Sequence, residues 1–270
     1  MKAKPADETY LFSNQDLKRL ILPLLVEQLL AITVGMADSI MVSSVGEAAV
    51  SGVSLVDTIF VLLINIFTAL ATGGAVVCGQ YLGKKRPEQA CQAADQLVLA
   101  TGILSILVMG LMYVLRTFIL NVVFGHIEPD VWNNCNIYFL IVSASIPFIS
   151  IYNAGAAIFR AQGDSKTPMK ISLLMNVINI IGNGILLYGF HFGVEGAAIP
   201  TLVSRMFAAV VILARAYKTD HVLHLTRPVV WKLHWPTLKK ILRIGVPNGL
   251  ENSMFQLGKI LVLSLVTQFG

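Results

Sequence analysis

Two carboxylates interrupt the first long apolar stretch of this chain, Leu20 to Ser43. Glu27 and Asp38 are separated by close to three full turns of an α-helix, so both would face the same side, about 16 Å apart along the axis. A carboxylate in hydrocarbon costs about 2.5–3.5 kcal/mol, and an acid inside a membrane span therefore indicates function. We favour a functional role for Asp38, whereas Glu27 fits a solvated group or a gate equally well.

A second polar face lies in the apolar run 171–188. Asn176, Asn179 and Asn183 follow one another at spacings of three and four, which places them on one helical face. In the next run, Thr201 adds a hydroxyl. Oxygen ligands of these kinds suit a hard cation, and a desolvated Asp can equally exchange a proton. The pair Asn179 and Asn183 favours a site, whereas Asn176 fits a cavity site and helix–helix hydrogen bonding equally well.

The remaining reactive side chains form no catalytic pattern. Cys78, Cys91 and Cys135 are scattered without CxxC spacing, which supports neither a disulfide framework nor a metal site. No residue set resembles a nucleophile triad, a phosphate loop or a zinc site. Asp57 lies near the outer end of the second apolar run, where contact with water explains it best. We therefore expect no enzymatic activity and no cofactor.

The elements that must position these residues are membrane-spanning helices. The chain is 56% hydrophobic and 13% charged, whereas soluble domains are about 45–50% apolar and about 25% charged. The apolar residues gather in runs long enough to cross a bilayer, for which about 20 residues suffice. We expect six spans, followed by a basic linker at 218–240 and a seventh run that opens at 241. The expected spans are 20–43, 50–82, 93–123, 136–159, 171–188 and 197–217.

The basic residues predict the orientation of these spans. All but three of the 20 Lys and Arg residues lie in the N-terminal tail or near the loops after the second, fourth and sixth runs; the exceptions are Arg116, Arg205 and Lys259. Loops rich in Lys and Arg face the cytoplasm. We expect a multi-pass protein of the plasma (inner) membrane with a cytoplasmic N-terminus. Because the net charge of +5 sits in short loops between apolar runs, we do not expect nucleic-acid binding.

The start of the chain is echoed near its end. LKRLILPLLVE at Leu17–Glu27 resembles LKKILRIGVPNGLE at Leu238–Glu251, and both place Glu four residues after Pro. This echo predicts a protein built from two similar halves. The apolar run that is still open at Gly270 predicts that the second half is cut short.

Four motifs, in this order, resemble the multidrug and toxic compound extrusion (MATE) family of cation-coupled efflux transporters. They are the segments Met36–Ser54, Gly79–Ala90, Phe159–Lys170 and Asn176–Thr201, of which FRAQGDSKTPMK is the most specific. The resemblance implies an all-α polytopic membrane protein with twelve helices in two six-helix lobes. It divides this chain into a first lobe (1–217), a cytoplasmic basic linker (218–240) and a truncated seventh helix that starts the second lobe (241–270).

The family resemblance also implies a cation site in the first lobe. The family's site residues correspond here to Asp38, Asn179, Asn183 and Thr201, which would bind Na⁺ if transport is sodium-coupled. Some members have Asp at the position of Asn183, so this chain has one negative charge fewer, and both Na⁺ and H⁺ stay open as coupling ions.

The seventh helix departs from the family pattern. Certain members place a cation-linked Glu eight residues after the Pro of this helix, where this chain has Phe255. Glu251 stands four residues after Pro247 and is kept only as a possible cavity or gate residue, alongside Glu27 and Asn176. A cation site in the second lobe therefore does not follow from the sequence.

The resemblance implies an antiporter that exports amphipathic organic cations or drugs by alternating access, as a full-length monomer in the bilayer. Two alternatives stay open. One is a flippase for lipid-linked oligosaccharides or precursors, although Arg116 and Arg205 are the only candidate cavity arginines. The other is a membrane scaffold that transports nothing, which the interrupted helix at Gly270 disfavours.

Overall fold

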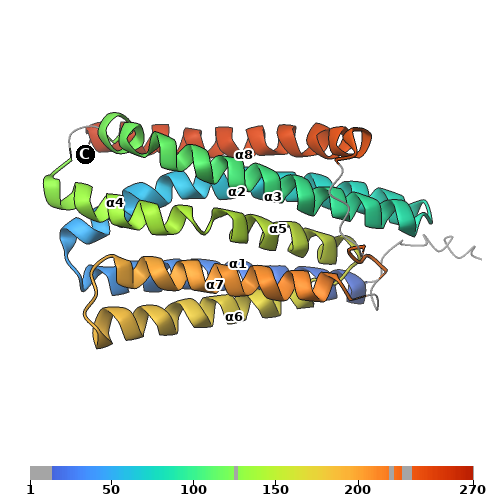
Figure 1. Cartoon of the computed structure of the whole chain (residues 1–270), viewed down its shortest axis with the longest axis horizontal. Helices are drawn as coiled ribbons and strands as arrows, with labels where there is room; N and C mark the ends of the chain where they lie inside the picture. Colours follow the sequence, from blue (N-terminus) through green and yellow to red (C-terminus); the bar gives the residue numbers. More distant parts are fainter. Residues whose placement is uncertain (1–13, 125–126, 219–221, 227–232, 270) are drawn as a thin grey trace, which may run out of the picture.

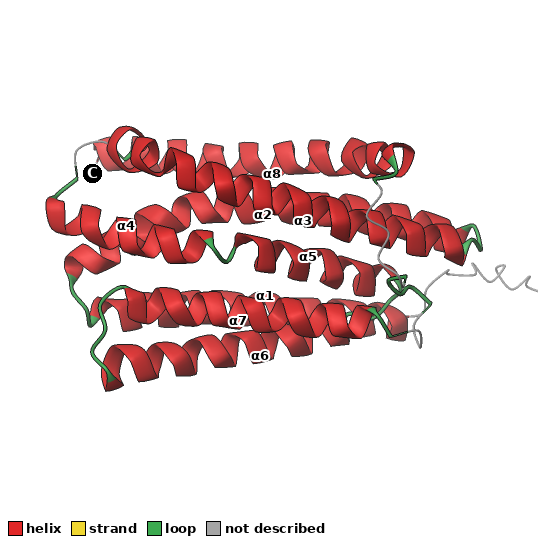
Figure 2. Cartoon of the chain, in the orientation of Figure 1, coloured by secondary structure: helices red, strands yellow, loops and turns green. Residues whose placement is uncertain are grey.

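The computed structural model describes residues 14–124, 127–218, 222–226 and 233–269, and these residues form helices joined by short loops (Figure 2). Four of the basic residues of the N-terminal tail and the linker, Lys2, Lys4, Arg227 and Lys232, lie outside the described residues. The elements are α1 (Asn14–Ser43), α2 (Glu47–Gly83), α3 (Pro87–Phe118), η1 (Ile119–Val123), α4 (Pro129–Ser143), α5 (Ile146–Ala161), α6 (Lys166–Asn183), η2 (Gly184–Gly189), α7 (Glu195–Ala216) and α8 (Trp235–Phe269), where η denotes a π-helix. The predicted all-helical membrane fold is confirmed.

Among the residues that the structure describes, five helical stretches are long and apolar enough to cross a membrane, and there are six if the bent pair α4–α5 counts as one span. The expected run 136–159 is bent in the structure, where α4 and α5 meet at an angle of 46°. Pro147 explains the break, since it has no N–H to donate to the carbonyl of Ser143. The chain instead turns at Ser145, whose N–H and hydroxyl both donate to the carbonyl of Val142.

The helices lie roughly side by side along the long axis of the molecule and fall into two groups (Figure 1). Helices α1, α6 and α7 pack together on one side, and α2, α3 and α8 pack together on the other. The bent pair α4–α5 lies between them and contacts α2, α3 and α7. Helix α8 begins at Trp235, six residues before the expected start of the seventh run.

The basic loops gather at one end of this bundle. The α2–α3 and α5–α6 connections, the end of α7 and the start of α8 all lie at that end, while the α1–α2 and η2–α7 connections lie at the other (Figure 1). An even number of crossings separates successive basic segments, so they return to the same end. This arrangement is what the alternation of charge along the sequence predicts.

The loop between α5 and α6 shows how a short motif aims a helix. Gly163 has a φ of 87°, which a glycine adopts without steric cost, and it ends α5. The next residue, Asp164, accepts hydrogen bonds from the backbone N–H groups of Lys166 and Thr167 at 3.0 and 3.1 Å. A carboxylate in this position satisfies N–H groups that the first turn leaves free, and it fixes where α6 begins.

Two clusters of buried apolar side chains hold the bundle, one toward each end. The cluster at the basic end includes Val77, Leu97 and Ile158, all nearly inaccessible to solvent. The other cluster includes Phe60 and Phe139, whose rings meet edge to face at 6.0 Å. Large apolar side chains on the outer faces of the helices are exposed, as expected where a membrane protein meets lipid rather than water.

Candidate functional site

A hydrogen-bonded polar network links α1, α6 and α7 inside the bundle. At its centre, the Asn183 side-chain amide donates to Asp38 Oδ1 at 2.6 Å. The same amide group approaches Asn179 Oδ1 at 3.5 Å. Asn183 is fully buried and Asn179 nearly so. The structure therefore brings the carboxylate of α1 against the amide face of α6.

The network continues from α6 to α7. The Asn179 side-chain amide donates to Thr201 Oγ1 at 3.0 Å, and the Thr201 hydroxyl donates in turn to the carbonyl of Ala197 at 2.9 Å. Because an ionised Asp38 can only accept hydrogen bonds, Asn183 must present the N–H side of its amide to the carboxylate. All four residues that the sequence singles out for a cation site thus belong to one connected set.

One atom in this network has no partner. Asn183 Oδ1 is buried and makes no hydrogen bond, and an unsatisfied buried polar atom costs about 1–3 kcal/mol. Asp38, Asn179 and Thr201 provide further oxygens beside it. Within the described part of the chain, no three His, Cys, Asp or Glu side chains gather as a metal site. A cation held here would therefore depend on amide and hydroxyl oxygens in addition to one carboxylate.

Close contact between α6 and α7 positions this network. A Cβ atom on Gly182 would lie 2.7 Å from Cβ of Pro200, so only glycine permits this approach. Gly182 directly precedes Asn183, and Pro200 directly precedes Thr201. The contact between Gly182 and Pro200 therefore sets the distance between the polar residues of α6 and Thr201 of α7. Immediately after Asn183 the helix becomes the π-helix η2. Such segments widen a helix locally and occur frequently at functional sites.

A second set of charged groups lies beside Asp38. The Tyr138 hydroxyl donates to Asp57 Oδ1 at 3.1 Å, and Arg205 Nη1 donates to the Ser145 hydroxyl at 2.7 Å. Arg205 is close enough to interact electrostatically with both Asp57 and Asp38. Asp57 is half-buried, and it has protein partners in Tyr138, by a hydrogen bond, and Arg205, by proximity.

Glu27 belongs to a separate cluster near the basic end. Its carboxylate forms an ion pair with Arg160 at 2.7 Å and accepts a hydrogen bond from the Tyr152 hydroxyl at 3.1 Å. The same hydroxyl lies 3.2 Å from the carbonyl of Pro168. This cluster ties α1 to α5 and to the start of α6. Of the two readings for Glu27, a solvated group and a gate, the packed ion pair argues against the solvated one.

The two other candidate residues do not join the network. Asn176 is buried on the same face of α6, and its Nδ2 atom has no hydrogen-bond partner. Glu251 is exposed on α8, which packs against α2 and α3 rather than against α1, α6 and α7 (Figure 1). The structure therefore separates Glu251 from the network around Asp38.

Sequence reasoning missed the cluster of Asp57, Tyr138 and Arg205. One signal could have found it: Arg205 lies within an apolar run, and a charge inside a membrane segment indicates a buried partner. No spacing rule, however, connects Arg205 of α7 to Asp57 of α2 or to Ser145 at the α4–α5 bend. These contacts arise only when α4–α5 packs between the two helix groups.

A model of the MatE family matches residues 23–185 of this chain. The transporter YisQ of Bacillus subtilis, described as uncharacterized, is 28% identical over 99% of this chain and 58% of its own length. The "probable multidrug resistance protein NorM" of Thermotoga maritima is 27% identical over 95% of this chain and 55% of its own length. The chain thus spans somewhat more than half the length of these relatives.

Solved structures share the fold. A structure of MATE in the straight conformation matches with a TM-score of 0.84 at 24% identity, covering 95% of this chain and 57% of that one. The outward-facing conformation of a multidrug resistance MATE family transporter matches with a TM-score of 0.79 at 24% identity, covering 90% of this chain and 52% of that one. At these identities the likeness establishes the helical architecture.

Proposed function

This chain belongs to the MATE family of efflux transporters, and from that premise we propose that the longer protein exports amphipathic organic cations or drugs in exchange for Na⁺ or H⁺. Members of this family are transporters rather than enzymes. In this proposal residues 1–217 form the first lobe, 218–240 a cytoplasmic linker, and 241–270 the start of the second lobe. The protein acts as a full-length monomer in the plasma membrane, with its N-terminus in the cytoplasm.

The hydrogen bond between Asp38 and Asn183 supports this proposal most directly. It joins an intramembrane carboxylate, at a cost that packing alone does not justify, to α6, and Asn179 extends the network from α6 to Thr201 of α7. An ion can shift a conformational equilibrium only by binding the two states unequally. Binding at Asp38 would replace the amide of Asn183 as its partner and so change how α1 is held against α6.

The oxygen set suits either coupling ion. Sodium would bind to oxygens of Asp38, Asn179, Asn183 and Thr201, and the unpartnered Asn183 Oδ1 would become a ligand. A proton would instead neutralise Asp38, whose charge is tolerable in this setting only when paired or hydrated. No further cofactor is needed, because the ion gradient supplies the energy.

The surroundings of Arg205 argue against a flippase for anionic lipid-linked precursors. A cavity that binds anionic head groups needs cations that are free to contact them. Arg205 instead donates to Ser145 and lies near two carboxylates, Asp57 and Asp38. Its charge is therefore largely compensated within the lobe, which leaves a cavity better suited to cationic substrates.

The test is efflux of a fluorescent organic cation from cells that express the full-length protein, with sodium and proton gradients collapsed separately. We expect the wild type to export the dye and Asp38→Asn to lose gradient-dependent export while inserting normally, because the amide cannot carry or release a charge. The gradient whose collapse stops the wild type identifies the coupling ion.

Asp57→Asn is the matched comparison, since it also removes one membrane carboxylate near Arg205. Export by Asp38→Asn at the wild-type rate would refute the coupling role of Asp38. Loss only in Asp57→Asn would transfer that role to Asp57. If the wild type exported no organic cation, the drug-export proposal would fail and the flippase alternative would gain.

A further inference from the structure

Two adjoining cavities open at the basic end of the bundle, between α2, α3 and α8. The first has a volume of about 450 Å³ and the second of about 360 Å³. They share three lining residues, Tyr81, Lys84 and Lys240. Because they share a wall, they form one basic recess at the junction between the α2–α3 turn and the start of α8.

The recess is strongly cationic. Lys84, Arg86, Lys240 and Arg243 line it, and among the described residues neither cavity has an Asp or Glu in its lining. Gln80, Gln89 and Gln92 add side-chain amides that can donate hydrogen bonds. Four cations together with neutral donors provide the chemistry that binds phosphate oxygens.

The cationic side chains are held on rigid backbone. The Arg86 N–H donates to the carbonyl of Tyr81 at 3.0 Å, and the Lys85 N–H donates to that of Leu82 at 2.9 Å. This pair of bonds commonly ends an α-helix, with a residue in the left-handed conformation that is usually glycine. Here Lys85 occupies that position, with a φ of 57°. The turn therefore presents Lys84 and Arg86 in a fixed arrangement.

The opposite wall of the recess is fixed by α8. Lys240 Nζ donates to the Tyr81 hydroxyl at 2.8 Å and lies 5.2 Å from the centre of its ring. Farther along these helices, a Cβ atom on Gly73 would lie 2.6 Å from the carbonyl oxygen of Ile241, so α2 and α8 are in backbone contact. Two close-packed helices thus hold the cations of both walls together.

The floor of the recess is apolar and the rim lies at a membrane boundary. Val77 and Ile244 line the first cavity on the side toward the middle of the bundle. Trp235, at the start of α8, is 63% exposed, and tryptophan is enriched where membrane helices leave the hydrocarbon. The recess thus has cations near the end of the bundle and apolar side chains toward its middle. A ligand with an anionic head group and apolar chains matches this arrangement.

We propose that this recess binds the phosphate head group of an anionic phospholipid and thereby fastens the α2–α3 turn to the start of α8. Head-group oxygens contact Lys84 and Arg243, while Lys240 stays on the Tyr81 hydroxyl and the acyl chains follow α8 beside Ile244. The proposal is independent of the transported substrate and of the coupling ion, because none of these residues belongs to the network around Asp38.

Native mass spectrometry of the purified full-length protein tests this site, with phosphatidylglycerol and phosphatidylcholine of identical acyl chains as probes. We expect phosphatidylglycerol to bind the wild type roughly 25-fold more tightly, at about fivefold for each of two contacting cations. The variant Lys84→Gln/Arg243→Gln should lose this preference and retain its phosphatidylcholine affinity. The single change Lys84→Gln should lower the preference about fivefold. This variant replaces the double variant in the test if the double variant does not fold.

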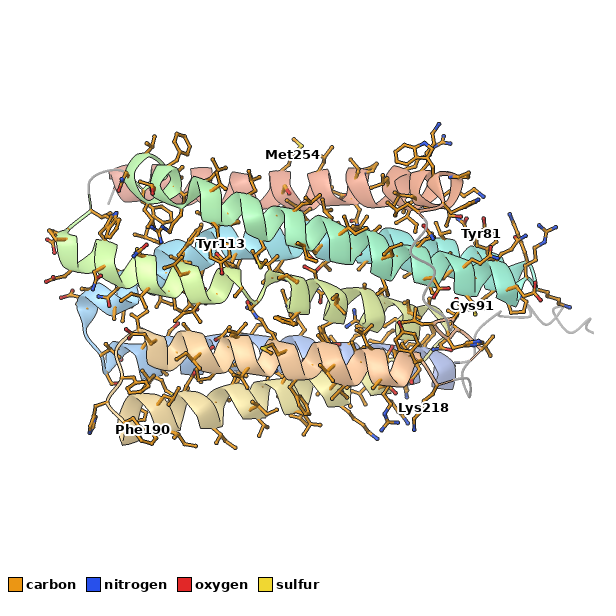
Figure 3. The ribbon with its side chains drawn as sticks, viewed as in Figure 1. Tyr81, Cys91, Tyr113, Phe190, Lys218 and Met254 are labelled. Carbon is orange, nitrogen blue, oxygen red and sulfur yellow. The ribbon has the colours of Figure 1, made fainter. Side chains whose placement is uncertain are left out.

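The matched control is Arg215→Gln/Lys218→Gln, which removes two cations at the same end of the molecule. Lys218 and Tyr81 lie on different sides of the bundle there (Figure 3), and neither Arg215 nor Lys218 lines the recess. This control and the charge-preserving variant Lys84→Arg/Arg243→Lys should keep the wild-type preference. An equal loss in the Arg215/Lys218 control, or an unchanged preference in the Lys84/Arg243 variant, would overturn the proposal. Full displacement of the lipid by soluble glycerol phosphate would assign the recess to a free phosphate instead.

Discussion

The two acids of α1 have different partners although they share one helical face. Glu27 pairs with the guanidinium of Arg160, so its charge is compensated by a cation of the same lobe. Asp38 accepts its hydrogen bond from the neutral amide of Asn183. A neutral donor can be exchanged for a cation or a proton without leaving an uncompensated positive charge. Of the two acids, Asp38 therefore has the chemistry of a reversible ion site.

The residue at 183 should set the preference for the ion. In Asn183→Asp, two carboxylates would share the site, and like charges that close favour uptake of a cation. We expect half-saturation of transport to occur at a Na⁺ concentration at least about tenfold lower, which corresponds to about 1.4 kcal/mol. The measurement is dye efflux against external Na⁺ at fixed pH.

Asn176→Asp is the control for the residue-183 experiment, because it adds a carboxylate to the same face of α6 outside the hydrogen-bonded network. It should leave the sodium dependence unchanged. A shift of equal size in both variants would show that Na⁺ responds to the charge of the lobe rather than to a site at Asn183.

At the scale of the helices, the close contact between α6 and α7 fixes the positions of the polar residues in the network. Asn179 and Thr201 meet because the backbone of α6 approaches Pro200 at Gly182. Small residues allow membrane helices to approach this closely, and the packing energy gained there holds the helices together. The ring of Pro200 is rigid, so it cannot move aside as a flexible side chain would. The geometry of the polar network therefore depends on one residue without a side chain.

Gly182→Ala should separate α6 from α7 and destabilise the lobe. Overpacking of this kind costs about 1–3 kcal/mol, and the hydrogen bond from Asn179 to Thr201 should lengthen. We expect a lower thermal unfolding midpoint in detergent and reduced efflux. Gly184→Ala is the matched control, since a Cβ atom there meets no atom within 4 Å. If both variants unfolded at the same temperature, the close contact would have no role in stability.

At the scale of the molecule, the two ends of the bundle differ in charge. The basic loops lie at one end, the recess between α2 and α8 lies there as well, and Phe190 marks the opposite end near the η2–α7 connection (Figure 3). On the positive-inside rule, we propose that the basic end faces the cytoplasm. The orientation of every loop then follows from the helical path alone.

Cysteine labelling tests this orientation in the full-length protein from which other reactive cysteines are removed. The native Cys78, Cys91 and Cys135 are buried and should not react. A membrane-impermeant maleimide should label Phe190→Cys in intact cells, because Phe190 is 65% exposed at the outer end. It should label Lys85→Cys only after the cells are permeabilised. Labelling of Lys85→Cys in intact cells would reverse the proposed orientation.

The sequence by itself determined the membrane class and placed Asp38, Asn179, Asn183 and Thr201 inside the apolar runs. Apolar runs and the alternation of basic loops reflect the cost of moving polar groups into hydrocarbon, and this cost acts on each segment separately. The Asn spacing on α6 is equally local, because helical geometry places residues three and four apart on one face. Local rules of this kind can be applied without knowing how the helices pack.

Only the tertiary structure decided which polar groups meet. The pairing of Glu27 with Arg160 and the grouping of Asp57 with Tyr138 and Arg205 join residues far apart in the chain. Each depends on the depth, rotation and neighbours of whole helices, which side-chain packing determines. The same holds for the recess between α2 and α8, whose cations come from segments more than 150 residues apart.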